Sequence, residues 1–169
     1  AKGVRWKSSY NQYKRFEILT SFIKNEIKES TIVDAGCGFA EYYNYLFDNN
    51  LKPKSYIGID CEEKMIELAS KRFLDTSFYI KNILQDEIPF ADYYICSGAM
   101  NILEKNEAFI FINNCFKASK KAFIFNLLKN DQLSKLNITD IYTYCKSLSN
   151  KINIRENYLD NDISILMEK

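Results

Sequence analysis

Short apolar runs alternate with longer amphipathic stretches through the middle of the chain. The short runs are rich in β-branched and aromatic residues, and each ends in a polar or glycine-containing turn, which is typical of buried strands. We predict strands over five such runs, at residues 31–35, 55–60, 77–80, 91–97 and 121–127. Strands that alternate with helices form a parallel sheet whose two faces are covered by those helices.

Apolar residues between the predicted strands recur at the spacing of one helical face. Met65, Ile66, Ala69 and Phe73 are an example, because they lie one, three or four residues apart. We therefore expect helices over residues 41–49, 62–73 and 105–118. Each of these would pack its apolar side on the sheet.

The two ends of the chain continue the same pattern. A leading helix is predicted over residues 12–27, with a buried side formed by Phe16, Leu19, Phe22, Ile23 and Ile27. Near the C-terminus we predict a helix over residues 139–148 and strands over 151–155 and 163–167. The chain has only two Pro and no repeat or low-complexity segment, so we expect one domain over residues 1–169.

Composition and charge exclude several kinds of chemistry. The 169 residues include 23 Lys and Arg against 22 Asp and Glu, a net charge of +1 that makes a nucleic-acid partner unlikely on electrostatic grounds. The chain contains no His, which excludes Ser-His-Asp and Cys-His catalysis and His-ligated zinc. A proton acceptor, if the reaction needs one, must therefore be a carboxylate, a phenol or an amine.

The cysteines and the N-terminus indicate where the protein resides. The five Cys form no C-x-x-C pair, so we expect buried free thiols and neither a thiolate zinc site nor a disulfide framework. The N-terminus lacks a signal-peptide core, and no stretch approaches the roughly 20 apolar residues of a membrane span. We expect a cytoplasmic protein without a membrane partner. The first residue is not Met, which leaves room for residues upstream.

A glycine-rich turn follows the first predicted strand. Gly36 and Gly38 let a ligand approach the backbone closely, and the next helix presents free N–H groups there. A dinucleotide-binding turn would need Gly or Ala at the position of Glu41, which disfavours NAD. The acid Asp34, two residues before the first glycine, instead favours a cofactor that carries an ammonium group.

The segment from Asp34 to Ala40 resembles the first motif, D/E-x-G-x-G-x-G/A, of the class I S-adenosylmethionine-dependent methyltransferases. The resemblance covers residues 31–168. It implies a doubly wound, Rossmann-like, mostly parallel α/β sheet of seven strands with an antiparallel last strand, and S-adenosyl-L-methionine as cofactor. The family places a carboxylate at the position of Asp60, where it binds both ribose hydroxyls, and an ionised carboxylate can accept two hydrogen bonds at once.

The resemblance also assigns the adenine end of the cofactor. An apolar side chain at the position of Met65 stacks on the ring, although Met65 also suits a plain core position. Asn82 stands where the family often has an Asp that accepts from the adenine amino group, and its alternative is a simple turn residue. Ile83 would supply a backbone N–H. The other cofactor contacts that the resemblance implies are Ala35, Gly36, Cys37, Gly38, Cys61 and Ser97.

The stretch from Val4 to Leu19 resembles a group of small bacterial class I methyltransferases in which this segment closes over the cofactor. Residues 1–30 would then cover the cofactor site, and residues 31–169 would form the Rossmann-like core. By the same likeness Gln12 or Arg15 pairs with the methionine carboxylate, since a guanidinium fits a carboxylate well. The alternative for Arg15 is a solvated charge on the helix.

The acceptor of the methyl group is less defined by the sequence. No insertion is large enough for a substrate domain, so we expect the acceptor pocket to be built from Tyr10, Tyr42, Tyr43, Met100, Asn101 and Asn126. The alternative for each of the three tyrosines is a core or surface position. No catalytic residue or metal ligand stands out. We predict methyl transfer to a small molecule or metabolic intermediate. A catalytically silent cofactor-binding or partner subunit and an RNA or protein methyltransferase are the alternatives, and the oligomeric state is open.

Overall fold

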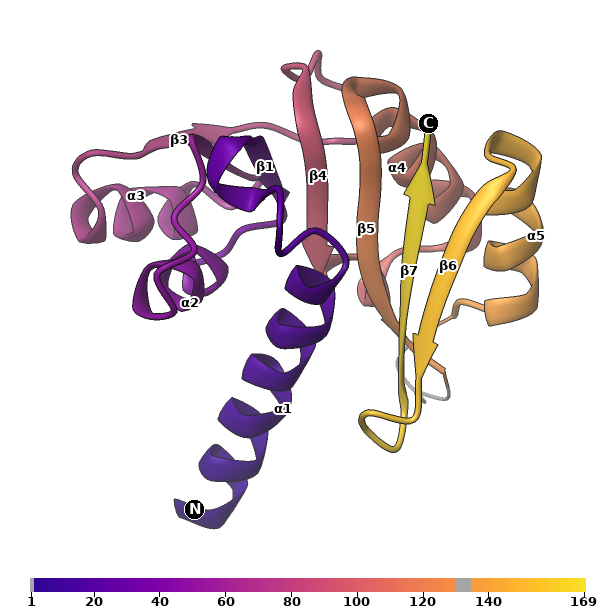
Figure 1. Ribbon diagram of the computed structural model, residues 1–169, viewed down its shortest axis with the longest axis horizontal. Coiled ribbons are helices and arrows are strands. Elements are labelled where there is room, and N and C mark those ends of the chain that lie inside the picture. Colours follow the sequence, from indigo (N-terminus) through magenta and orange to yellow (C-terminus); the bar gives the residue numbers. More distant parts are fainter. Residues whose placement is uncertain (1, 130–134) are drawn as a thin grey trace.

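A seven-stranded sheet forms the centre of the molecule (Figure 1). The computed structural model describes residues 2–129 and 135–169, with side chains from residue 8 onward. The strands, in chain order, are β1 Thr31–Ala35, β2 Ser55–Asp60, β3 Ser77–Ile80, β4 Ala91–Ser97, β5 Ser119–Leu128, β6 Lys151–Glu156 and β7 Asp162–Glu168. Their order in the sheet is β3-β2-β1-β4-β5-β7-β6. β1 to β5 pair in parallel and β7 is antiparallel to both neighbours, as predicted.

Helices cover both faces of the sheet. The helices are α1 Lys2–Ser21, α2 Glu41–Asp48, α3 Glu63–Arg72, α4 Lys105–Ala118 and α5 Ile138–Leu148, with short 3-10 turns at Ile27–Glu29 and Ala99–Ile102. Buried residues of α1, α2 and α3 form one apolar cluster with the sheet, whereas those of α4 and α5 form a second cluster on the opposite face. This is the doubly wound α/β arrangement that the sequence predicted.

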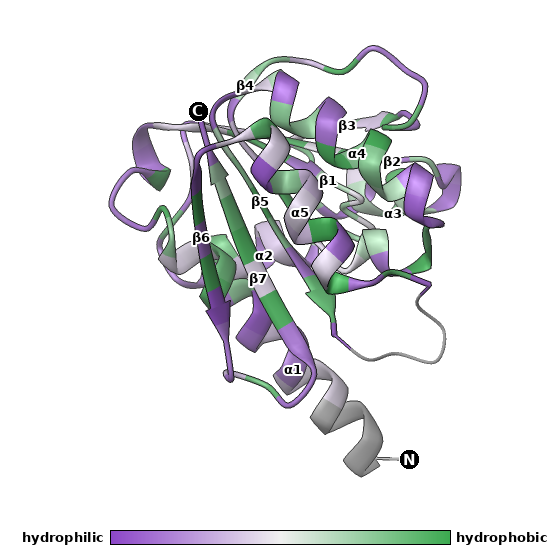
Figure 2. Ribbon diagram, turned by 90° about the vertical axis from the view of Figure 1, so that its right-hand side faces the viewer, coloured by the Kyte–Doolittle hydropathy of each residue, from purple (hydrophilic) through white to green (hydrophobic). Residues whose placement is uncertain are grey.

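Burial follows the position of each strand in the sheet. The largest enclosed side chains include Tyr94 of β4 and Phe123 and Phe125 of β5. Figure 2 shows hydrophobic residues concentrated along β5 and β7, whereas the edge strand β6 is largely hydrophilic. Among the described residues, no helix is both long and apolar enough to cross a membrane.

The leading helix differs from the prediction over residues 12–27. α1 begins earlier and ends at Ser21, whose hydroxyl donates to the Ile18 carbonyl at 2.6 Å and so satisfies an acceptor of the last turn. Ile23 and Ile27 are buried as predicted, but they reach the core from the turns that follow the helix. Apolar spacing alone did not reveal where the helical hydrogen bonds stop.

The carboxyl ends of β1 and β4 lie side by side at the centre of the sheet. The chain leaves β1 toward α2 on one face and leaves β4 toward α4 on the other. Open α/β sheets bind ligands at such a switch point, because the two departing connections leave a crevice between them.

Candidate functional site

The turn after β1 has a backbone that only small residues fit. Gly36 has a φ of +79°, and a Cβ added there would lie 2.3 Å from the Cβ of Ala99. The N–H groups of Gly36 and Cys37 donate to the Ile59 carbonyl of β2 at 2.7 and 3.0 Å. Ala40, the last residue of the motif, is left-handed at a φ of +62° and leads into α2. The turn is therefore fixed to the neighbouring strand.

Asp60, at the end of β2, is held by two backbone groups. Its Oδ2 accepts from the Gly38 N–H at 2.9 Å and its Oδ1 accepts from the Glu62 N–H at 2.9 Å. These bonds fix the carboxylate, and each oxygen keeps a further lone pair for another donor. The geometry suits a ligand with two adjacent hydroxyl groups.

Asp34 is a buried carboxylate beneath the glycine turn, with 2 % of its surface exposed. The Tyr56 hydroxyl donates to its Oδ2 at 2.5 Å. Burial raises the pKa of Asp34 to about 7; the Tyr56 hydrogen bond opposes this increase and the charge of Asp60 adds to it. No ion pair between Asp34 and a cationic side chain occurs in the described part of the chain. A cationic ligand would supply the missing charge.

A cavity of about 410 Å³ opens at this end of the sheet. Eight residues that the sequence assigned to the cofactor line it, namely Gly36, Gly38, Asp60, Cys61, Met65, Asn82, Ile83 and Ser97. The sequence missed the others, which are Ile59, Glu62, Lys81, Leu84, Ala99, Ile102, Leu103 and Phe111. Ile102 is 87 % exposed in the turn after β4, and an apolar residue beside the Ser-Gly turn was the signal that could have identified it.

Asn82 and Ile83 form one wall of this cavity. The Asn82 Oδ1 accepts from the Leu84 N–H at 2.9 Å, so Asn82 has the role of a turn residue and keeps one lone pair for a ligand. The Asn114 side chain of α4 donates to the Ile83 carbonyl at 2.8 Å and holds the Ile83 peptide in place. Both observations are compatible with an adenine ring at this wall.

The structure places five other predicted cofactor residues outside the cavity wall. Ala35 and Cys37 are buried next to the turn, and Asp34 lies beneath it. Gln12 is half-buried on α1, and no described side chain of α1 lines the cavity. Arg15 is paired within the protein, since its Nε and Nη2 donate to Asp162 at 2.6 and 3.2 Å, so the alternative of a solvated charge on the helix is wrong.

The structure places the predicted acceptor residues at different sites, three of them in the core. Tyr42, Tyr43 and Met100 are core residues, because α1, α3 and α4 cover the faces on which they lie, and they do not line the cavity. Tyr10 is 57 % exposed on α1. Asn101 accepts from the Leu128 N–H at 3.1 Å and so joins the ends of β4 and β5.

Asn126 is the last of the predicted acceptor residues. It is buried at the end of β5, and its Nδ2 donates to Asp162 at 3.1 Å. It therefore belongs to the same hydrogen-bonded group as Arg15.

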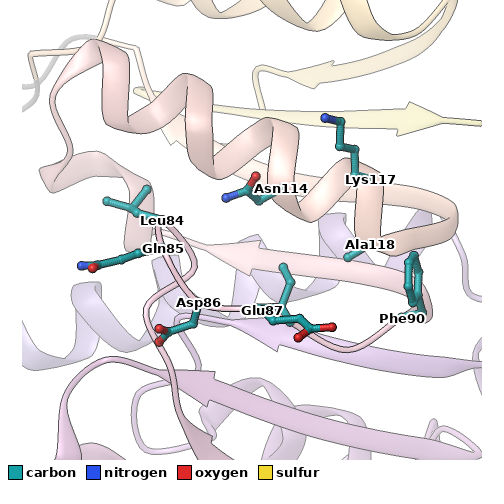
Figure 3. Close-up of a pocket in the computed structure, with 9 residues that line it drawn as sticks. Leu84, Gln85, Asp86, Glu87, Phe90, Asn114, Lys117 and Ala118 are labelled. Atoms are coloured by element: carbon teal, nitrogen blue, oxygen red, sulfur yellow. The ribbon is translucent and has the colours of Figure 1, made fainter.

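A second cavity, of about 370 Å³, lies between the β3–β4 connection and the end of α4 (Figure 3). Leu84 lines both cavities, whereas Asp86, Glu87, Asn114 and Lys117 line the second and not the first. None of the residues that line this second cavity is a glycine, and none belongs to the turn after β1. The first cavity is the one that combines the glycine turn with Asp60.

Comparison with known proteins agrees with this geometry. The family model described as "Methyltransferase domain" matches residues 32–122, which is more than half of the chain. The protein 235L of Invertebrate iridescent virus 6, provisionally named a methyltransferase, is 28 % identical over 125 residues. That alignment covers 69 % of this chain and 46 % of the viral protein, so the chain spans about half the length of this curated relative.

Solved structures share the fold at low sequence identity. A TehB-like S-adenosylmethionine-dependent methyltransferase from Corynebacterium glutamicum has a TM-score of 0.76 at 15 % identity, over 99 % of this chain and 96 % of that one. Magnesium protoporphyrin IX methyltransferase from Synechocystis, solved with S-adenosylhomocysteine, has a TM-score of 0.74 at 13 % identity, over 92 % and 83 %. The family match shows that the chain belongs to the methyltransferase domain family, and the solved structures show that it has the fold of S-adenosylmethionine-dependent methyltransferases.

Proposed function

We propose that this protein transfers the methyl group of S-adenosylmethionine to a small-molecule acceptor. The cavity that joins Asp60 to the glycine turn at the switch point is the observation that carries the proposal. It combines a fixed carboxylate, an approachable backbone and apolar walls, which together suit an adenosine with a charged amino-acid tail.

The cavity residues suggest how the cofactor lies. Asp60 would accept from both ribose hydroxyls, because its two oxygens are already oriented by backbone N–H groups. Met65 and Ile83 would contact the adenine ring from α3 and the β3–β4 connection. The methionine ammonium group would lie at the glycine turn, where the charge of Asp34 is otherwise uncompensated.

Methyl transfer from a sulfonium is an in-line displacement. A lone pair of the acceptor forms the new bond to the methyl carbon while the carbon–sulfur pair returns to sulfur, which leaves neutral S-adenosylhomocysteine. The donor is already activated, so the protein contributes alignment and exclusion of water. This requirement is compatible with a chain that contains no His.

A small acceptor suits the domain that surrounds the site. We infer that residues 31–169 form a single core and that residues 1–30 pack beside the site, because α1 lies in the same apolar cluster as α2 and the sheet although its described side chains do not line the cavity. A net charge of +1 does not favour a nucleic-acid acceptor. Four of the five free cysteines are buried, which is compatible with a reducing compartment such as the cytoplasm.

Calorimetric titration with S-adenosylhomocysteine tests the cofactor site. The wild-type protein should bind, and Asp60→Ala should weaken binding by about 100-fold, because two hydrogen bonds to a charged group are lost. Asp75→Ala is the matched control, since this exposed carboxylate pairs with Lys52 away from the cavity. Equal affinity of the wild type and Asp60→Ala would contradict the assignment.

A radiolabelled methyl-transfer screen tests the acceptor. Metabolite pools should yield labelled products, whereas peptide and RNA pools should not. Labelling of RNA or peptide alone would contradict a small-molecule acceptor, and binding of cofactor without any transfer would favour a catalytically silent subunit.

A further inference from the structure

Three side chains form a polar row beside the proposed cofactor cavity. Ser97 of β4, Asn126 of β5 and Ser164 of β7 are register neighbours, so their side chains share one face of the sheet. Ser97 lines the cavity. Asn126 lies one strand farther, at a spacing of about 4.8 Å between strands, on the side away from the proposed adenosine site. The row therefore begins at the cofactor and leads away from it.

Asn126 is held in one orientation by an ion pair. Its Nδ2 donates to the Asp162 Oδ1 at 3.1 Å, and the same carboxylate accepts from Arg15 Nε at 2.6 Å and Nη2 at 3.2 Å. An ionised carboxylate only accepts hydrogen bonds, so it selects the nitrogen end of the amide. The Asn126 Oδ1 must then point away from Asp162.

The Asn126 Oδ1 is buried and has no hydrogen-bond partner among the residues that the structure describes. Buried polar atoms in folded proteins nearly always have a partner, and an orphaned acceptor is destabilising. The two serines beside it do not satisfy it: the Ser164 Oγ pairs with the Tyr158 hydroxyl at 2.7 Å. The Ser97 hydroxyl does not donate to it either. Asn126 itself lines neither the first nor the second cavity, but its neighbour Ser97 lines the first one, so a ligand that reaches this oxygen from the first cavity must bring its own N–H or O–H.

We propose that the methyl acceptor is a neutral amine whose N–H donates to the Asn126 Oδ1. The proposal depends on the methyl transfer proposed above and specifies the class of acceptor. Arg15 and Asp162 are positioning residues, because they act on the acceptor only through the orientation of Asn126.

An amine fits this oxygen better than other nucleophiles do. Its free lone pair attacks the methyl carbon without prior deprotonation, the carbon–sulfur pair returns to sulfur, and the resulting ammonium then releases one proton to water. An Asn oxygen accepts a hydrogen bond but does not take the proton. A hydroxyl would need a base, and Asp162, the nearest carboxylate to Asn126, is already engaged by Arg15. A carboxylate acceptor has no proton to donate.

The test uses tritiated S-adenosylmethionine at about pH 9, where an appreciable fraction of an alkylamine has released its proton to water and is neutral. The four matched probes, 2-phenylethylamine, 2-phenylethanol, 2-phenylethanethiol and 3-phenylpropanoate, differ in the nucleophilic group. The wild-type protein should methylate the amine and leave the other three unlabelled. Labelling of the alcohol, thiol or carboxylate at the rate of the amine or above would overturn the proposal. So would the absence of amine labelling by a protein that binds S-adenosylhomocysteine.

Two variants address the oxygen itself. Asn126→Leu removes it and should lower kcat/KM for the amine by about tenfold or more, while the affinity for S-adenosylhomocysteine changes less than about twofold. Asp162→Asn should lower kcat for the amine at unchanged cofactor affinity, because the new amide no longer selects the nitrogen end of Asn126. Asn44→Leu is the control, since this amide also donates to a carboxylate, Asp48, but on the surface of α2.

The outcomes distinguish a failure of the proposed methyl transfer from a failure of the acceptor assignment. Loss of S-adenosylhomocysteine binding by the wild type would refute the proposed function itself. Full amine methylation by Asn126→Leu, or a crystal structure of the cofactor complex in which an enclosed water alone satisfies the Oδ1, would refute only the acceptor assignment. If Asn126→Leu does not fold, the preference of the wild type among the four probes still decides.

Discussion

Cofactor binding should weaken as the pH falls below 7, because the proposed partner of the cofactor's ammonium group takes up a proton. Burial raises the pKa of Asp34 to about 7 in the free protein, with a further increase from Asp60. An ammonium group beside Asp34 stabilises the ionised carboxylate, so the pKa must fall on binding and a proton must leave.

The size of the effect follows from the fraction of Asp34 that is ionised before binding. With a pKa of about 7, about half of the protein carries the charge at pH 7 and about one in a hundred molecules does at pH 5. The affinity for S-adenosylhomocysteine should therefore fall by about 50-fold from pH 7 to pH 5, with a slope near tenfold per pH unit at the acid end.

Asp34→Asn isolates this carboxylate. The variant should bind S-adenosylhomocysteine more weakly at pH 7, and its affinity should no longer depend on pH between 5 and 7. Calorimetry in two buffers of different ionisation enthalpy would also show that the proton release of the wild type is lost. Asp48→Asn, on the exposed side of α2, should keep the wild-type profile.

The stability of the free protein provides a second, independent readout. The pKa of Asp34 is raised in the folded state from an ordinary value of 3.8, so the folded protein holds a proton that the unfolded chain releases between about pH 4 and 7. Stability from this group is present below pH 4 and is lost as the pH rises to 7. Asp34→Asn should be more stable than the wild type at pH 8 by up to about 4 kcal/mol and equal at low pH. A flat affinity profile for the wild type, or no gain in stability at pH 8, would refute the reasoning.

Three further predictions concern the groups around the site. Tyr56→Phe removes the hydrogen bond that lowers the pKa of Asp34, so the midpoint of the affinity profile should move to higher pH in the same titration. Gly36→Ala forces a side chain into a left-handed backbone and against Ala99, and should lower the free energy of unfolding in urea by about 2 to 4 kcal/mol. Arg15→Ala leaves a buried carboxylate without its partner and should cost about 3 kcal/mol in the same assay, at the low end because the arginine is partly exposed.

The fold and the glycine turn could be predicted because they depend on local signals. The alternation of short apolar runs with amphipathic stretches predicted every strand. The bounds of β1 to β4 match the prediction residue for residue. Gly36 and Asp60 were identifiable because a positive φ and a strand-end carboxylate leave recognisable residue types. These features require only neighbours in the chain or in adjacent strands.

The acceptor side could not be predicted in the same way, because it depends on contacts between distant segments. Arg15 and Asp162 are 147 positions apart, and no local pattern indicates that they meet. Tyr42 and Tyr43 carry polar hydroxyls at the start of α2, yet α1 and α3 enclose them. The unpartnered oxygen of Asn126 becomes visible only when the whole hydrogen-bond network is assembled.

A crystal structure of the protein with S-adenosylhomocysteine tests the proposed cofactor site most directly. We predict that both ribose hydroxyls donate to Asp60, that the adenine ring lies between Met65 and Ile83, and that the ammonium group lies at the glycine turn above Asp34. A ligand bound elsewhere, for example in the cavity between Glu87 and Lys117, or a ribose without contact to Asp60, would contradict the account.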